Sequence, residues 1–132
     1  MKKFATLFLA LALLISFSSC FKAKAPTVDS VVETREIELN VGDIYQIKLE
    51  GNATTGYLWS FKTEFDGTIL QYKDQKVERP DNNNIVGAPE INIWEFEAMK
   101  EGITTATLEY KRPWEKEEEP LQTIHYKITI LP

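Results

Sequence analysis

Short runs of alternating apolar and polar residues recur along most of the chain. Four such runs occupy residues 36–41, 45–49, 94–98 and 124–130, the first of them ending at Val41. An alternation with period two places apolar side chains on one face of a β-strand and polar side chains on the other. From residue 20 onward no stretch has the 3.6-residue periodicity of an amphipathic helix. The pattern therefore predicts several half-buried strands.

Clusters of turn-forming residues separate these runs. They contain Gly, Asn, Asp or Pro and lie at residues 41–43, 51–52, 66–67, 79–82 and 101–102. Short strands joined by turns, with no helix between them, predict an antiparallel β-sandwich of about seven strands. Three stretches interrupt the alternation, at 51–56, 79–90 and 112–120. Because alternate connections of a sandwich lie at the same end, these three loops can form one contiguous edge.

The composition excludes several classes of protein. The chain has 132 residues, the size of one domain, with one Cys, one His and a formal charge of -5 at pH 7. One Cys cannot form an internal disulfide, and one Cys with one His cannot supply the four ligands of a structural zinc site. A net negative charge argues against nucleic-acid binding, which rests on clustered Lys and Arg. We therefore expect a partner other than a nucleic acid.

Groups that support catalysis are scarce. His125 is the only imidazole, and it lies on the polar face of an alternating run, where we expect it to be solvent-exposed. No Gly-rich phosphate loop and no cluster of metal ligands appears. The acidic run from Glu115 to Glu119 is typical of a solvated loop. The sequence predicts a protein that is not an enzyme and that needs no cofactor or metal.

The N-terminal segment follows a different pattern. Two lysines precede an apolar run from Phe4 to Phe17, and two serines and Cys20 follow it. As a helix this run would span about 21 Å, less than the roughly 30 Å hydrocarbon core of a bilayer, which is typical of a signal peptide. Small residues directly before a Cys resemble the bacterial lipobox, in which the thiol is lipidated and the chain is cut just before it. An ordinary secretory signal with an incidental Cys is the alternative.

These features predict three regions. Residues 1–19 form a lipoprotein signal peptide, residues 20–30 a tether anchored to the lipid bilayer through Cys20, and residues 31–132 the folded domain. The expected location is the cell envelope, outside the cytoplasm, at the outer membrane or the cell surface.

Three loop motifs point to a function. They are Asn52-Ala53-Thr54-Thr55-Gly56-Tyr57, Gly87-Ala88-Pro89 and Arg112-Pro113-Trp114. In this order they resemble the chagasin family, proteinaceous inhibitors of papain-type cysteine peptidases with an immunoglobulin-like fold. The resemblance covers about residues 31–132 and implies a β-sandwich of about seven to eight strands. The family usually has Pro where this chain has Ala53, and Gly where it has Glu90.

The resemblance also implies a mechanism and a binding site. The protein is expected to be a monomer and a reversible, tight-binding inhibitor that occludes the cleft of a papain-like cysteine peptidase with its three loops. Thr54 would lie nearest the catalytic cysteine of the peptidase, and Trp114 on the primed side of the cleft. The implied peptidase-binding residues are Asn52, Thr54, Thr55, Gly56, Tyr57, Gly87, Ala88, Pro89, Arg112, Pro113 and Trp114.

Several points stay open at this stage. Arg112 either braces its loop or pairs with Glu115, and the charge of Glu90 either points outward or biases the choice of peptidase. Ala53 in place of Pro is expected to leave the first loop more flexible. Trp59 and Trp94, in alternating runs, are expected in the core, whereas Trp114 is expected to be an exposed anchor. An immunoglobulin-like surface lipoprotein with a structural or adhesive role is the alternative function.

Overall fold

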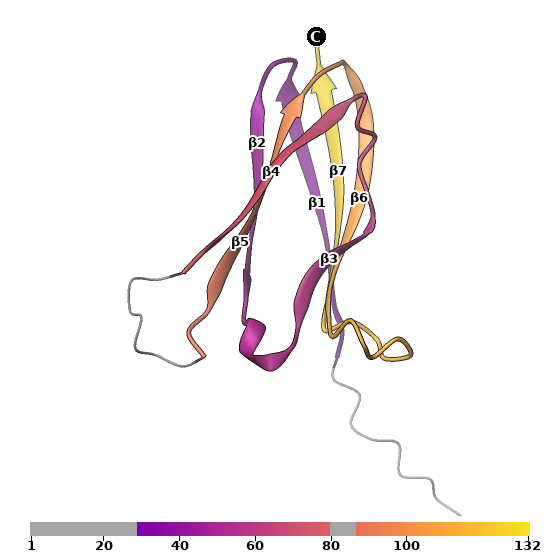
Figure 1. Ribbon diagram of the computed structural model, residues 1–132. Coiled ribbons are helices and arrows are strands. Elements are labelled where there is room, and N and C mark those ends of the chain that lie inside the picture. The colour runs from indigo at the N-terminus through magenta and orange to yellow at the C-terminus, as the bar shows by residue number, and fades with distance from the viewer. Residues whose placement is uncertain (1–28, 80–86) are drawn as a thin grey trace, which may run out of the picture.

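The computed structural model describes residues 29–79 and 87–132, in which seven strands form two facing sheets (Figure 1). A four-stranded sheet has the order β1-β7-β6-β3, and a three-stranded sheet has the order β2-β5-β4. The prediction of an all-β, immunoglobulin-like sandwich is confirmed. The strands are β1 (Val31–Asn40), β2 (Ile44–Gly51), β3 (Leu58–Thr63), β4 (Leu70–Glu78), β5 (Glu90–Ala98), β6 (Gly102–Lys111) and β7 (Gln122–Leu131), and a single 3₁₀ turn, η1, spans Ala53–Thr55.

One of the five strand pairings is parallel. β1 runs parallel to β7, with Val31 opposite Gln122, and the other four pairings are antiparallel. The backbone N–H of Val31 donates to the carbonyl of Leu121 at 3.0 Å. β1 therefore begins beside the connection that precedes β7, and the domain's first strand starts at the same end of the sandwich as that connection (Figure 1).

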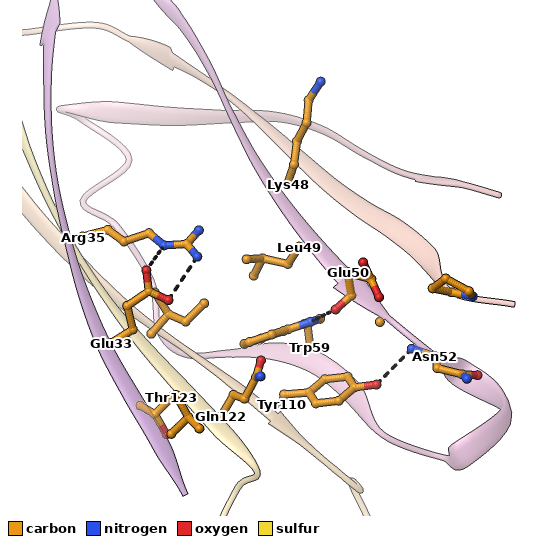
Figure 2. A pocket seen from close by; sticks show the side chains of 14 residues that line it. Glu33, Arg35, Lys48, Leu49, Glu50, Asn52, Trp59, Tyr110, Gln122 and Thr123 are labelled. Atoms are coloured by element: carbon orange, nitrogen blue, oxygen red, sulfur yellow. Dashed lines mark hydrogen bonds and ion pairs between the residues drawn. The ribbon is translucent and has the colours of Figure 1, made fainter. Parts of the chain in front are cut away.

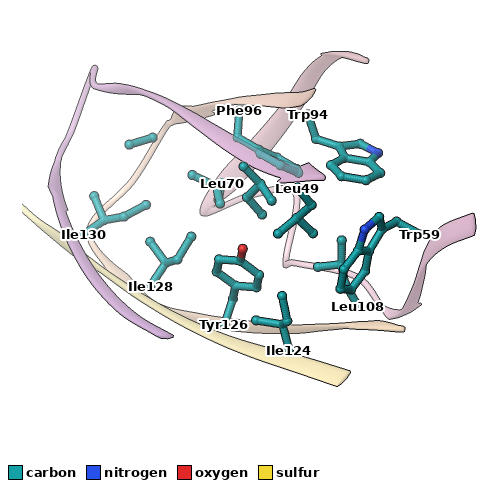
Figure 3. Close-up of a cluster of buried hydrophobic side chains, with 12 residues drawn as sticks. Leu49, Trp59, Leu70, Trp94, Phe96, Leu108, Ile124, Tyr126, Ile128 and Ile130 are labelled. Carbon is teal, nitrogen blue, oxygen red and sulfur yellow. The ribbon is translucent and has the colours of Figure 1, made fainter. Parts of the chain in front are cut away.

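The core lies between the two sheets and is built from the inward positions of the alternating runs (Figure 3). In β7 these positions are the four apolar residues of the run 124–130, each no more than 4% exposed. Trp59 is 8% exposed and Trp94 is 3% exposed, so both are core residues as predicted. A cluster of this kind stabilises the domain by removing apolar surface from water.

Two predictions about surface positions have different outcomes. His125 is exposed and its Nδ1 lies 3.0 Å from the Thr107 hydroxyl, so the expected solvent-exposed histidine is confirmed. Val41 was expected to continue the first alternation, and this is wrong. β1 ends at Asn40, whose N–H donates to the Asp43 carboxylate at 2.8 Å, and Gly42 turns the chain with a φ of 93°. The tight turn leaves Val41 47% exposed.

The expected signal peptide, Cys20 and most of the tether lie outside the described residues. Within residues 29–79 and 87–132, no helix has the length and apolar character needed to cross a membrane.

Candidate functional site

Three connections meet at one end of the sandwich (Figure 1). We call them the first loop (residues 52–57, β2 to β3), the second loop (79–89, β4 to β5) and the third loop (112–121, β6 to β7), and together the loop edge. They carry the three motifs found in the sequence. Residues 80–86 of the second loop lie outside the described part of the chain, whereas Gly87, Ala88 and Pro89 lie within it.

The first loop is a capped 3₁₀ turn. The side chain of Asn52 accepts a hydrogen bond from the N–H of Thr54 at 3.1 Å, and the Thr55 hydroxyl donates to the Asn52 carbonyl at 2.6 Å. Gly56 ends the turn with a φ of 80°, and its N–H donates to the carbonyl of Ala53 at 3.0 Å. This positive φ favours glycine. The loop thus has a defined shape even though Ala53 replaces the usual proline.

Arg112 joins the third loop to the first. Its Nε donates to the carbonyl of Thr55 at 3.1 Å, and its guanidinium carbon lies 4.6 Å from the centre of the Tyr57 ring. Its Nη1 also contacts the Glu115 carboxylate at 3.1 Å. The sequence offered bracing of the loop and pairing with Glu115 as alternatives for Arg112, and the structure shows both. A planar guanidinium is suited to this role because it can stack on a ring while its edge donates hydrogen bonds.

Trp114 is the exposed aromatic residue of the loop edge. Its side chain is 66% exposed, which confirms the expectation that it is not a core residue. One edge of its ring packs against Gly56, where an added Cβ would lie 2.5 Å from Trp114 Cη2. Pro113, directly before it, is also exposed and restricts the backbone. Trp114 therefore presents a large apolar surface on a restrained backbone.

The second loop contacts the first through Asn52 and Thr54. The Asn52 side-chain amide donates to the carbonyl of Gly87 at 2.9 Å. Gly87 has a φ of 84°, and a Cβ at this position would lie 3.8 Å from the Thr54 hydroxyl. Asn52 thus shapes its own turn with its side-chain oxygen and holds the second loop with its side-chain nitrogen. The described parts of all three loops form one connected surface.

Glu90 does not point outward. The residue is 8% exposed, opens β5 opposite Gly51, and its carboxylate contacts Arg79 Nε at 3.1 Å. The outward orientation, one of the two possibilities considered for this charge, is wrong. A carboxylate with so little exposure requires a partner, and Arg79, the first residue after β4, supplies it. The pair closes the base of the second loop.

Tyr110 was missed by the sequence analysis. It lies on the inward face of β6, two residues before Arg112, and its ring centre is 5.5 Å from that of Tyr57. Its inward position in an alternating strand that leads directly into the third motif is the signal that could have identified it.

The described residues of the loop edge offer a binding surface and do not include a nucleophile beside an imidazole base. Thr54 and Thr55 are exposed hydroxyl side chains next to an exposed tryptophan, and His125 lies in the middle of β7 rather than in a loop. Among the described residues, no group of three or more His, Cys, Asp or Glu side chains is placed to hold a metal ion. The arrangement is suited to contact with a protein surface.

Residues 38–129 match the family model described as "Chagasin family peptidase inhibitor I42". The chain belongs to the chagasin family. The match includes all three loops, and the members of this family are protease inhibitors and not enzymes. The chagasin resemblance predicted from the loop motifs is therefore confirmed, as is the prediction that the protein is not an enzyme.

Two relatives from Entamoeba histolytica support the chagasin assignment. Amoebiasin-2 is 35% identical over 94 residues, which cover 71% of this chain and 76% of that protein. The crystal structure of the cysteine protease inhibitor EhICP2 superposes with a TM-score of 0.64 at 29% identity, covering 76% of this chain and 95% of that one. PbICP-C, solved in complex with falcipain-2, has a TM-score of 0.61 at 22% identity, with 77% of this chain and 91% of that chain covered. The last similarity shows the shared fold.

Proposed function

We propose that this protein is a reversible, tight-binding inhibitor of papain-like cysteine peptidases that blocks the active-site cleft with its loop edge. The observation that carries the proposal is the connection of the three loops into one exposed surface. Arg112 bonds the third loop to the first, and Asn52 bonds the first to the second. The similarity to EhICP2, a cysteine protease inhibitor, and to PbICP-C, which binds falcipain-2, supports a peptidase as the partner.

The chemistry of the first loop fits such a cleft. A papain-type active site has a thiolate and an imidazole at its floor, so an inserted group should be small and uncharged. Thr54 and Thr55 are exposed, neutral and able to hydrogen-bond, and the turn that carries them is capped by Asn52. No covalent step is required of the inhibitor, because occupancy of the cleft excludes the substrate.

Trp114 is the proposed anchor on the primed side of the cleft. Large, rigid aromatic side chains dominate binding energies when a partner buries them, at about 2 kcal/mol or more for a hot spot. The ring is already braced on one side by Gly56 in the free protein. Binding therefore costs less conformational entropy than ordering a free tryptophan would.

Titration of active papain with the domain spanning residues 29–132 tests this proposal. We expect complete, reversible inhibition with a fixed stoichiometry of one inhibitor per enzyme and no cleavage of the inhibitor. Absence of inhibition at micromolar concentration would leave the structural or adhesive function as the better explanation. Mass spectrometry of the recovered inhibitor checks that no bond has been cut.

We further infer that residues 1–19 are a lipoprotein signal peptide and that Cys20 carries the lipid that holds the domain outside the cytoplasm, in the cell envelope. The succession of two lysines, an apolar run and two small residues directly before Cys20 supports this inference. Expression of the full chain and of Cys20→Ser in a bacterial host, followed by detergent partitioning and intact-mass measurement, tests it. Equal partitioning of the two proteins into the aqueous phase would contradict lipidation.

A further inference from the structure

Two side chains from the four-stranded sheet cross to the backbone of β2, which is an edge strand of the other sheet (Figure 2). The Trp59 indole N–H donates to the carbonyl of Glu50 at 2.9 Å. The backbone N–H of Asn52 donates to the hydroxyl oxygen of Tyr110, also at 2.9 Å. Asn52 is the residue at which β2 gives way to the first loop.

These bonds satisfy backbone groups that the sheet itself leaves free. Along an antiparallel edge strand, the residues whose backbone groups face the neighbouring strand alternate with residues whose groups face away from it. The Glu50 carbonyl and the Asn52 N–H, on either side of Gly51, bond to Trp59 and Tyr110, so both of these groups face away from β5. An unpaired backbone group of an edge strand is a free hydrogen-bonding site. Trp59 bonds to the Glu50 carbonyl and Tyr110 to the Asn52 N–H, and the two bonds tie the start of the first loop to the opposite sheet.

Tyr110 lies where the core and two of the loops meet. Its ring centre is 5.0 Å from that of the buried Trp59 and 5.5 Å from that of Tyr57, on which the Arg112 guanidinium stacks. Its neighbour two residues along the chain, Arg112, begins the third loop. A single residue thus contacts the core, the first loop and the base of the third loop.

We propose that Tyr110 is a positioning residue for inhibition, whose hydroxyl fixes the first loop at the Asn52 N–H. The inference rests on the proposed function, because it names the group that holds Thr54 and Thr55 ready for the cleft. Without the hydroxyl, the backbone N–H of Asn52 loses its hydrogen-bond acceptor, and Tyr110 no longer ties the turn to the opposite sheet. The peptidase must then order the loop on binding, which weakens the complex.

The substitution Tyr110→Phe tests the hydroxyl alone, since it keeps the ring and its stacking. The matched control is Tyr126→Phe. Tyr126 is 1% exposed, and its hydroxyl accepts a hydrogen bond from Arg35 Nη1 at 3.0 Å rather than from a loop. Three quantities are measured for both variants: the inhibition constant for papain, the melting temperature, and the hydrogen-exchange rate of the Asn52 amide.

We expect Tyr110→Phe to weaken inhibition about two- to tenfold, the range for one lost hydrogen bond, and to accelerate exchange of the Asn52 backbone amide by a similar factor. Tyr126→Phe should leave the inhibition constant and the exchange rate of the Asn52 backbone amide as in the wild type. The melting temperatures of the two variants should fall by similar amounts. This separation distinguishes positioning from a merely structural role, which would lower the melting temperature without a selective effect on inhibition.

Two results would overturn the inference, and a third would refute the proposed function on which it rests. Inhibition by Tyr110→Phe at the wild-type level, with the wild type active against papain, would refute positioning by Tyr110 while the proposed function stands. A wild-type domain that does not inhibit papain would instead refute the proposed function. The exchange rate of the Asn52 backbone amide tests separately whether the Tyr110 hydroxyl holds the first loop. An unchanged rate in Tyr110→Phe would show that it does not.

Discussion

Trp114 packs against Gly56 so closely that a side chain at position 56 would displace its ring. A Cβ there would lie 2.5 Å from Trp114 Cη2 and 3.0 Å from Trp114 Cζ2, and the backbone φ of 80° is itself unfavourable for residues with a side chain. The glycine of the first loop is therefore required twice, once for the turn and once for the tryptophan of the third loop. The shapes of these two loops depend on each other.

Gly56→Ala should consequently impair inhibition more than folding. The added methyl group displaces Trp114 or strains the turn, and we expect inhibition of papain to fall at least tenfold, with a loss of about 1 to 2 kcal/mol in the free energy of unfolding. Enzyme titration and chemical denaturation measure the two effects. The matched control is Gly67→Ala, because a Cβ at Gly67 meets no atom within 4 Å. Equal loss of inhibition in both variants would contradict the proposed role of Gly56.

Thr54→Glu should weaken inhibition strongly while leaving thermal stability nearly unchanged. Thr54 is exposed in the free protein, so the fold tolerates a charge there. In the complex the carboxylate would be buried beside the peptidase thiolate, at a cost of about 2 kcal/mol or more, or roughly 30-fold in the inhibition constant. Thr105→Glu, a change on the exposed face of β6, is the control. If Thr54→Glu inhibits as well as the wild type, Thr54 does not enter the cleft.

Trp114→Ala should mainly raise the rate at which the complex dissociates. Loss of a buried aromatic anchor acts on dissociation more than on association, and a hot spot of about 2 kcal/mol corresponds to roughly 30-fold. Stopped-flow or surface-binding kinetics give both rates. Ile103→Ala, which removes a 60% exposed side chain at the start of β6, is the control. A variant that loses only stability would show that Trp114 supports the fold instead.

Glu109 should make the stability of the domain depend on pH in the acidic range. Its side chain is only 7% exposed; burial raises its pKa, but hydrogen bonds from Lys62 and Lys111 outweigh burial and hold the pKa below the ordinary value of 4.5. A carboxylate with a lowered pKa stabilises the folded state above its unfolded pKa. This stabilisation is lost as the pH falls through the folded pKa, which lies below 4.5.

The variant Glu109→Gln isolates this effect. At neutral pH we expect its melting temperature to lie roughly 4 to 8 °C below that of the wild type, the shift for about 1 kcal/mol in a small domain. The difference should shrink as the pH is lowered from about 5 to about 3, because the wild type then loses its charge as well. Glu38→Gln, on an exposed part of β1, is the control. A difference that stays constant over this range would refute the assignment to Glu109.

The hydrophobic pattern predicted the strands well but not every pairing. β5 and β7 bury alternate side chains over residues 94–98 and 124–130, so these two runs were correctly expected to line the core. Alternation is the same in parallel and antiparallel strands, however, and the parallel pairing of β1 with β7 cannot be inferred from it. The first run was extended one residue too far, because the apolar Val41 continues the alternation although it already belongs to the turn at residues 41–43.

The motifs identified the loop edge, but not how it is assembled. Arg112 and Thr55 are 57 positions apart, and Asn52 and Gly87 are 35 apart, so their contacts depend on how the strands are arranged. The burial of Glu90 depends likewise on Arg79, eleven residues away across a hairpin. The strand position of Tyr110, just before the third motif, can be read from the sequence, but only the facing sheet reveals that its hydroxyl meets the Asn52 backbone N–H.

The start of β1 determines which end of the sandwich is attached when the domain is held by its N-terminus. Val31 is bonded to Leu121 at the loop edge, whereas the C-terminus lies at the far end of the sandwich (Figure 1). The chain from Cys20 to Val31 reaches at most about 40 Å. If Cys20 carries the proposed lipid, the attachment point and the loop edge belong to the same end of the domain, and the reach of residues 21–30 limits how far the loop edge can stand from the bilayer. For binding measurements on a solid support, attachment through the C-terminus at Pro132 leaves the loop edge open.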